Sequence, residues 1–251
     1  MYETCYRVRQ RLEAIFDYAE IEDHCVGNPS KGLQKIFTKP QPKNHSSLPI
    51  SELPVYLKKV VNDDGAFQAT KLAMIFMIHV FVRTKSLRHA KWIDFDMECD
   101  EPLWIVPNYD MKNGLELHVP LSNQAVKILE EMKHFSGPDG YVFTQARNPQ
   151  KPMSENTLLY LSNRLGYAGR NTIHGFRKVA STILHESSLW NYDAVEKQLS
   201  HLVGTKVSRA YNKAEHLKER RKMLVWYSNY IDSLSNTAKV IDITKKRRRV
   251  V

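Results

Sequence analysis

The chain has 251 residues, of which 42% are hydrophobic and 25% are charged, proportions typical of a soluble globular protein with one sizeable core. Its formal net charge is +10; the run 245–249 supplies five of these positive charges, so the rest of the chain still carries +5. A basic surface suggests a polyanionic partner, but the charge alone is equally compatible with a merely soluble basic protein.

Several classes of protein are excluded at this level. The three cysteines, Cys5, Cys25 and Cys99, are isolated and form no CxxC or Cys/His cluster, which excludes a disulfide framework and a zinc site. The longest apolar run, 72–82, is interrupted by His79 and is too short to span a bilayer. The N-terminus lacks the apolar segment of a signal peptide. We therefore expect a soluble protein in a reducing, intracellular setting.

The N-terminal part of the chain indicates a helix followed by a linker. Apolar residues recur at helical spacing over 3–22, with arginines between them. The proline-bearing, apolar-poor stretch that follows, centred on 38–49, is the clearest linker in the chain. Because the part before it is too short to be a stable domain alone, we interpret 1–37 as the end of a helical module.

The rest of the chain predicts a mostly helical domain with one small antiparallel sheet. A helix over 67–82 is apolar nearly all round and should be buried. Two strands are expected on either side of the tight turn at Asn113-Gly114. These strands are predicted at 103–106 and 116–120, and further helices at 51–62, 123–134, 155–164, 174–187, 192–200 and 213–234. Ser51 is expected to cap the first of these helices, and Asp193 with Glu196 is expected to form a capping box in the helix over 192–200.

Six positions carry side chains suited to chemistry on an anion, although each has an ordinary structural explanation by itself. His174 and Arg177 lie three apart at a helix start, off its apolar face, and together offer an anion site or simply a solvated helix end. Arg83 ends the buried helix and could cap its last carbonyls. Lys112 precedes the predicted hairpin turn, His201 ends the helix over 192–200, and Tyr211 is one of twelve tyrosines. None of these residues decides the function alone.

The order and spacing of these six residues indicate the function more specifically than any one of them. The series Arg83, Lys112, His174-x-x-Arg177, His201, Tyr211 resembles the active-site signature of the tyrosine recombinase or phage integrase family, in its prophage-integrase branch. The likeness covers about 3–234 and extends to the flanking residues at 81–83, 87–92, 111–112, 119–122, 174–182, 198–201, 210–212 and 219–226. It implies a mostly α catalytic domain at 51–234, preceded by the end of a SAM-like helical core-binding domain (1–37) and a linker (38–50), and followed by a basic, disordered tail (235–251).

The resemblance also implies a mechanism. Tyr211 would attack a DNA phosphate and form a 3′-phosphotyrosyl link, while Lys112 protonates the departing 5′ oxygen. Arg83, Arg177 and His174 would hold the non-bridging oxygens, and His201 would bind the phosphate or help to move the tyrosine proton. The link conserves the energy of the phosphodiester, so no ATP is expected. Because two arginines would neutralise the phosphate, no metal or other cofactor is expected either.

The implied function is site-specific recombination, the integration or excision of a prophage or mobile element. Its partners would be double-stranded attachment-site DNA and other protomers in a tetrameric complex on that DNA, with no membrane involved. The amphipathic segment 220–234 could pack in its own core or dock on a neighbouring protomer. We expect a bacterial cytoplasmic protein associated with the nucleoid.

Two departures from the family pattern leave alternatives open. Ser86 stands where relatives usually carry an acidic residue, and only the last part of a core-binding domain is present. These features favour an integrase remnant that binds DNA without cutting it, whereas the complete set of six residues opposes that view. A type IB topoisomerase shares much of the chemistry, but His174 and the flanking residues favour the recombinase.

Overall fold

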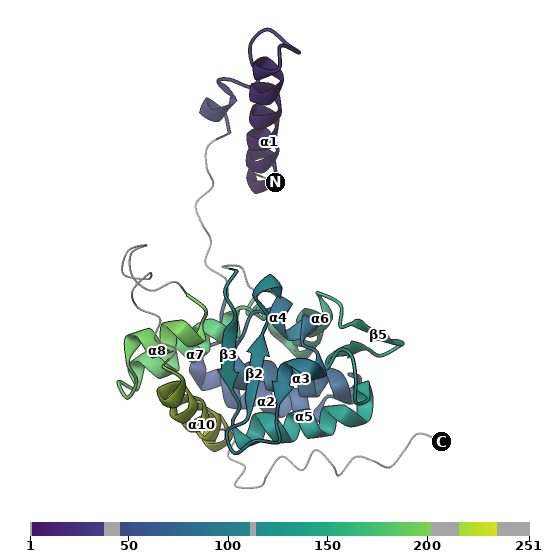
Figure 1. Ribbon diagram of the computed structural model, residues 1–251, viewed down its shortest axis with the longest axis vertical. Coiled ribbons are helices and arrows are strands. Elements are labelled where there is room, and N and C mark those ends of the chain that lie inside the picture. Colours follow the sequence, from purple (N-terminus) through teal and green to yellow (C-terminus); the bar gives the residue numbers. More distant parts are fainter. Residues whose placement is uncertain (1, 38–45, 111–113, 202–215, 235–251) are drawn as a thin grey trace. The chain divides into compact units, whose positions relative to one another are not determined.

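The computed structural model describes residues 2–37, 46–110, 114–201 and 216–234, and the chain divides into two compact units, Met1–Asn44 and His45–Val251 (Figure 1). Several expectations fall outside the described residues: Lys112 and Asn113, Tyr211, most of the linker, the start of the helix predicted from 213, and the basic tail. Within the described residues, no helix is long and apolar enough to cross a membrane. The thiols of Cys5, Cys25 and Cys99 are free.

The first unit is built on α1 (Tyr2–Ile21), the helix predicted from the apolar spacing. The amide of Asn28 donates to the carbonyl oxygen of Glu13 at 3.0 Å and to the Asp17 carboxylate at 2.8 Å, which holds the following loop against the helix. Much of the apolar face of α1 is nevertheless exposed, with Ile15 at 61%. The origin of this unit as the end of a core-binding domain stays a prediction.

The second unit is mostly helical and is organised around one buried helix. Its helices are α2 (Leu53–Asn62), α3 (Gln68–Val80), α4 (Thr84–His89), α5 (Asn123–Ser136), α6 (Thr157–Ser162), α7 (Gly175–Glu186), α8 (Tyr192–Gln198) and α10 (Leu217–Leu234). Every residue of α3 from Lys71 to Val80 is buried, because α2, α5, α6, α7 and α10 all pack against it. The prediction of a helix that is buried on all sides is confirmed.

A small antiparallel sheet covers part of this bundle. It has the order β1-β2-β3, with β1 at Phe95–Asp96, β2 at Leu103–Val106 and β3 at Leu117–Pro120. In this register Trp104 pairs with Val119, and both side chains are fully buried. The two predicted strands and the mostly helical fold class are therefore confirmed. The sequence analysis missed β1 and a separate hairpin of β4 (Thr144–Gln145) and β5 (Asn148–Pro152).

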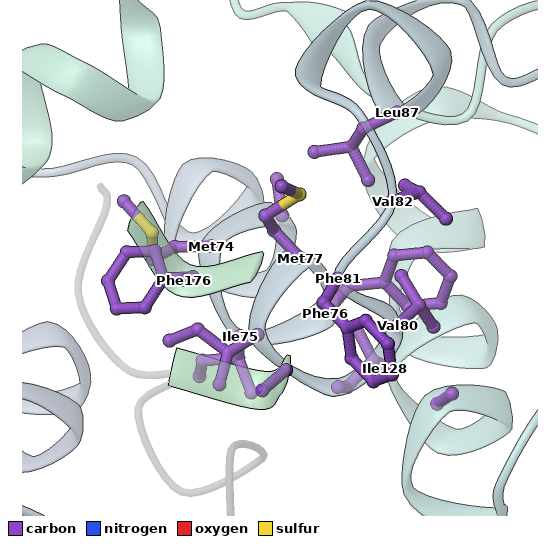
Figure 2. Packing of buried hydrophobic residues seen from close by; sticks show 14 of the residues in the cluster. Met74, Ile75, Phe76, Met77, Val80, Phe81, Val82, Leu87, Ile128 and Phe176 are labelled. Carbon is purple, nitrogen blue, oxygen red and sulfur yellow. The ribbon is translucent and has the colours of Figure 1, made fainter. Parts of the chain in front are cut away.

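Aromatic packing joins α3 to the sheet and to the segment before β4. The ring of Phe76 lies 6.0 Å from that of Trp104 and 5.3 Å from that of Phe143. Phe95 stacks on Trp104 at 5.0 Å. Figure 2 shows the side chains of α3 and the turn after it converging in this core, with Phe76, Val80 and Phe81 near Ile128 of α5. Such close packing fixes the end of α3, from which the candidate site begins.

Three predicted helix boundaries are wrong, each for a local reason. The buried helix ends at Val80 and not at 82, because Phe81 turns into the left-handed region at φ 40°. Ser51 lies in a 3-10 turn before α2 and does not cap that helix. In α8 the side chain of Asn191 accepts from the backbone N–H of Asp193 at 2.9 Å, so Asn191 is the cap in place of Asp193.

The core contains a buried histidine whose pKa gives the fold a measurable acid sensitivity. His79 Nδ1 lies 3.0 Å from Ser228 Oγ, which donates to Ser122 Oγ at 2.8 Å, so α3, α10 and the start of α5 meet there. Burial lowers the pKa of His79 from 6.5 to about 4, and the Asp232 carboxylate only partly opposes this shift.

Between pH 6.5 and 4 the unfolded chain binds a proton at His79 and the folded chain does not, so the free energy of unfolding falls as the pH falls through this window. We expect the wild-type protein to lose about 3 kcal/mol more than His79→Asn over that range. Urea titrations of both proteins at several pH values measure the difference. Parallel pH profiles of the two proteins would contradict the assignment.

Candidate functional site

The site begins where the chain leaves α3. After the left-handed turn at Phe81, Arg83 has an extended backbone and stands at the N-cap position of α4. Its guanidinium does not cap α3, as one interpretation of the sequence had it; Nη2 donates to the carbonyl oxygen of Ser200 at 3.1 Å. Its other terminal nitrogen, Nη1, is buried and has no hydrogen-bond partner among the described residues. A buried guanidinium nitrogen without a partner is costly unless a ligand supplies one.

Arg177, in the first turn of α7, lies beside it. Of the two alternatives left open for this helix start, a solvated end does not apply to Arg177, which is only 3% exposed. Nη1 donates to the carbonyl oxygen of Phe81 at 2.7 Å, and Nη2 donates to that of Leu199. The Phe81 carbonyl is free to accept because α3 has ended and offers it no helical partner. The turn that shortens α3 therefore also anchors Arg177.

Neighbouring backbone carbonyls hold Arg83 and Arg177, and the two positive charges repel each other. The carbonyls of Leu199 and Ser200 hold one guanidinium each. Burial lowers the pKa of Arg177 to about 10, with a further contribution from the Arg83 charge and an opposing one from Glu196; burial also lowers the pKa of Arg83. Arg177 with a pKa of about 10 is still protonated at neutral pH. Two adjacent, partly desolvated cations form a site for an anion.

The start of α7 is held by the segment that leads out of the linker. The backbone N–H of Thr172 donates to the carbonyl oxygen of Ser46 at 3.1 Å, and the N–H of Leu48 donates to Asn171 Oδ1 at 3.2 Å. Gly175 packs so closely here that a Cβ would collide with the Ser46 carbonyl oxygen. His174, at the N-cap position of α7, is exposed. The exposed His174 side chain therefore directly precedes a tightly packed glycine, which fixes the backbone next to it.

His201 follows the end of α8 and is held by a carboxylate from that helix. The chain turns at Ser200, which has a φ of 55°, and the backbone N–H of His201 donates to the carbonyl oxygen of Glu196 at 2.9 Å. The Glu196 carboxylate lies 2.8 Å from His201 Nδ1 and 3.3 Å from His185 Nε2. The expected capping-box role of Glu196 is therefore wrong, because its side chain contacts two histidines.

A second buried arginine joins α10 to the same region. Arg220 is completely buried and donates through Nη2 to Gln198 Oε1 at 2.8 Å and to the carbonyl oxygen of His118 in β3. Gln198 in turn donates to the carbonyl oxygen of Val80 at 3.3 Å. The end of α3, the end of α8 and the start of α10 are thus tied together by side chains. This network adjoins the carbonyls that hold Arg83 and Arg177.

The amphipathic helix α10 packs in the core of its own unit. Met223, Leu224, Tyr227 and Ile231 are at most 1% exposed. Of the two alternatives left open by the sequence, packing in its own core is the one observed for this face.

The structure therefore brings together part of the predicted site. Arg83, Arg177 and His201 converge on the backbone of 196–201, and His174 lies three residues before Arg177; Lys112 and Tyr211 are outside the described residues. Ser86, at the position that is usually acidic in relatives, is 2% exposed within α4. Glu196, Gln198 and Arg220 were not predicted as contributors to the site. Gln198 and Arg220 lay only in the flanking family likeness at 198–201 and 219–226, and Glu196 only in an expected capping box.

The described site thus lies in a mostly helical domain with a small antiparallel sheet, where neighbouring backbone carbonyls hold the partly buried Arg83 and the buried Arg177. Comparison with known proteins identifies the family. The model of the phage integrase family matches residues 57–217, so the chain belongs to that family, and the resemblance seen in the sequence is confirmed.

The curated relatives include phage and prophage integrases. The integrase of Enterobacteria phage P4 is 34% identical over 263 residues, which cover 98% of this chain and 59% of the relative. Prophage integrase IntA of Escherichia coli K12 is 31% identical over 248 residues, with 99% and 59% covered. The chain thus spans about three fifths of the length of these relatives.

Solved structures show the same fold at lower identity. XerH recombinase in a post-cleavage complex with a palindromic difH substrate superposes with a TM-score of 0.61 at 14% identity, covering 96% of this chain and 68% of that one. A lambda integrase tetramer bound to a Holliday junction gives a TM-score of 0.57 at 18% identity, covering 80% and 57%. These likenesses establish the fold of a tyrosine recombinase catalytic domain.

Proposed function

We propose that this chain carries out site-specific DNA recombination by cleaving and rejoining strands through a 3′-phosphotyrosyl intermediate at Tyr211. The observation that carries the proposal is the pair Arg83 and Arg177. Both guanidinia are held by backbone carbonyls, and Arg83 Nη1 is buried without a partner among the described residues. A tetrahedral phosphate, with two non-bridging oxygens, supplies the acceptors and the negative charge that this pair lacks.

The proposed chemistry assigns a role to each of the six residues of the family signature. The Tyr211 oxygen bonds to phosphorus as the bond from phosphorus to the 5′ oxygen breaks; the tyrosine proton passes to His201, and Lys112 gives a proton to the leaving 5′ oxygen. Arg83, Arg177 and His174 stabilise the charge that develops on the non-bridging oxygens. The 5′ hydroxyl of a second DNA strand then gives its proton to Lys112 and attacks the phosphotyrosine; the phosphodiester reforms as the bond to Tyr211 breaks, and His201 returns a proton to the tyrosine oxygen. No cofactor is required in this scheme.

The names of the relatives suggest the biological setting. The P4 and E. coli relatives are integrases of a phage and a prophage, and the lambda relative was solved as a tetramer on a Holliday junction. By analogy, we assign this chain to the integration or excision of a prophage or mobile element. Its partners are attachment-site duplexes and further protomers in a tetramer on DNA. It would act in the bacterial cytoplasm, at the nucleoid.

A covalent-trapping experiment tests the proposal. The protein is mixed in EDTA with nicked duplexes that carry candidate attachment sequences, so that loss of the short 5′-hydroxyl fragment traps the intermediate. We expect a protein–DNA band that resists detergent and disappears on protease treatment. Mass spectrometry of the digested adduct should place the nucleotide on Tyr211 and not on Tyr192, which is 60% exposed and serves as an internal control.

The same assay distinguishes the proposed recombinase from a non-cleaving remnant and from a topoisomerase. DNA binding by folded protein without any adduct would overturn the proposal in favour of a non-cleaving remnant. An adduct accompanied by relaxation of plasmid supercoils, with no exchange between two duplexes, would support a topoisomerase instead.

A further inference from the structure

Helix stability does not explain why a carboxylate stands at position 196. It lies in the last turn of the short helix α8, where the helix dipole disfavours a negative charge. Its side chain is only 14% exposed. A carboxylate kept in such a place requires partners, and the two histidines His185 and His201 are the partners that the structure shows.

The contact to His201 fixes the ring in two ways. An ionised carboxylate only accepts hydrogen bonds, so at 2.8 Å it takes the hydrogen on Nδ1 of His201. The neutral ring then has its lone pair on Nε2, the nitrogen farther from Glu196. The backbone adds a second constraint, because the Glu196 carbonyl oxygen accepts the His201 N–H at 2.9 Å. Both the tautomer and the place of the ring therefore depend on Glu196.

Glu196 also acts on the arginine pair. Burial and the charge of Arg83 lower the pKa of Arg177, and Glu196 opposes them. Ser86 stands three residues after Arg83 and carries no charge, whereas Glu196 brings a negative charge to Arg177 from a different helix. The Glu196 side chain thus contacts His201 and favours the charged form of Arg177.

We propose that Glu196 is the positioning residue of the site, which holds His201 in the Nδ1–H tautomer and leaves the Nε2 lone pair available to accept a proton during cleavage. The inference rests on the proposed function. During cleavage, Nε2 accepts the tyrosine proton, and the carboxylate stabilises the imidazolium that results.

The test compares single-turnover cleavage rates on the nicked duplex for wild type, Glu196→Ala and Glu196→Gln. Loss of an orienting partner should slow adduct formation by about tenfold to a hundredfold in Glu196→Ala. The affinity for DNA should change by less than about threefold, because the phosphate-binding arginines remain. Gln offers an oxygen to the Nδ1–H group but no negative charge to the imidazolium, so Glu196→Gln should recover only part of the rate.

Two controls separate positioning from general loss of structure. His185→Gln removes the other partner of the carboxylate and should cleave at close to the wild-type rate. Glu186→Ala removes an exposed carboxylate from the end of α7 and should also be neutral. A double-mutant cycle gives the decisive readout: in a His201→Ala background, Glu196→Ala should cost less than about another threefold, because it acts through the missing ring.

The outcomes are distinguishable from failure of the proposed function. If wild type forms no adduct, the recombinase assignment itself fails. If wild type cleaves and folded Glu196→Ala cleaves equally fast, or the two losses multiply in the double variant, the positioning role is overturned. Nitrogen-15 NMR of the histidine rings gives a spectroscopic check, with His201→Gln used for assignment. Wild type should show Nδ1–H at His201, and an Nε2–H tautomer there would contradict the proposal.

Discussion

Arg177→Met is expected to lower the rate of adduct formation on a nicked duplex by about a thousandfold, because it removes a fixed charge aimed at the phosphate from a site shielded from water. Arg177 is 3% exposed and is locked by the carbonyls of Phe81 and Leu199, so its guanidinium does not need to reorganise when charge develops. Met fills a similar volume and offers no donor. Single-turnover trapping at saturating protein measures the loss.

The matched control is Lys178→Met. Lys178 is the next residue of α7, is exposed, and loses the same unit of charge when it is replaced. Both variants should weaken DNA binding to a similar small extent, and only Arg177→Met should lose cleavage. A comparable loss of cleavage in both would mean that net charge, and not the placement of the guanidinium, governs the rate.

The stability of Arg177→Met depends on two opposing effects. The variant leaves two buried carbonyls without their donor, which costs about 1–3 kcal/mol for each. It also removes a buried cation whose charged form is disfavoured by burial and by Arg83. We expect these effects to offset to within about 2 kcal/mol, so the variant should remain folded. Circular dichroism and urea unfolding establish this before any rate is compared.

The fold was largely predictable because its dominant features are periodic. The buried helix α3 and the strands of the main hairpin, β2 and β3, follow from runs of apolar residues, which the core requires. The short strands were not predictable: β1 has two residues, and β5 (Asn148–Pro152) contains two prolines and no alternating apolar pattern. In β1, Phe95 stacks on Trp104 of the neighbouring strand, a contact that the two residues of β1 do not reveal by themselves.

The family was predictable from the sequence, whereas the backbone groups that support the candidate site were not. The order of Arg83, His174, Arg177 and His201 identified the family without any three-dimensional information. The left-handed turns at Phe81 and Ser200 could not be anticipated, since neither residue is a glycine. Yet those turns release the carbonyls that bind the two arginines.

Glu196 illustrates the same limit. Its spacing from Asp193 suggested a capping box, which depends only on local sequence. The actual cap is Asn191, and the carboxylate turns to histidines on either side of it in the chain, one from α7 and one after α8. Contacts between helices, and not the local sequence pattern, therefore determine where the Glu196 side chain lies.

Arg83→Lys is the second change for which we expect a large effect, a loss of about a hundredfold in the rate of adduct formation. Arg83 uses Nη2 to hold the Ser200 carbonyl oxygen and leaves Nη1 buried and unpartnered among the described residues. A lysine ammonium is a single point of contact, so it cannot span the carbonyl and a phosphate oxygen in the way the planar guanidinium can. Because the charge is conserved, DNA affinity should change by less than about threefold.

Arg88→Lys is the matched control for this change. Arg88 lies in the same short helix, and its guanidinium also binds a backbone carbonyl, with Nε donating to Met153 at 2.7 Å. The same substitution there should cost some stability and leave cleavage intact, because Met153 is no part of the site. Equal cleavage losses in the two variants would show that α4 as a whole is sensitive. A loss of cleavage confined to Arg83→Lys would support Arg83 Nη1 as the group that binds the phosphate.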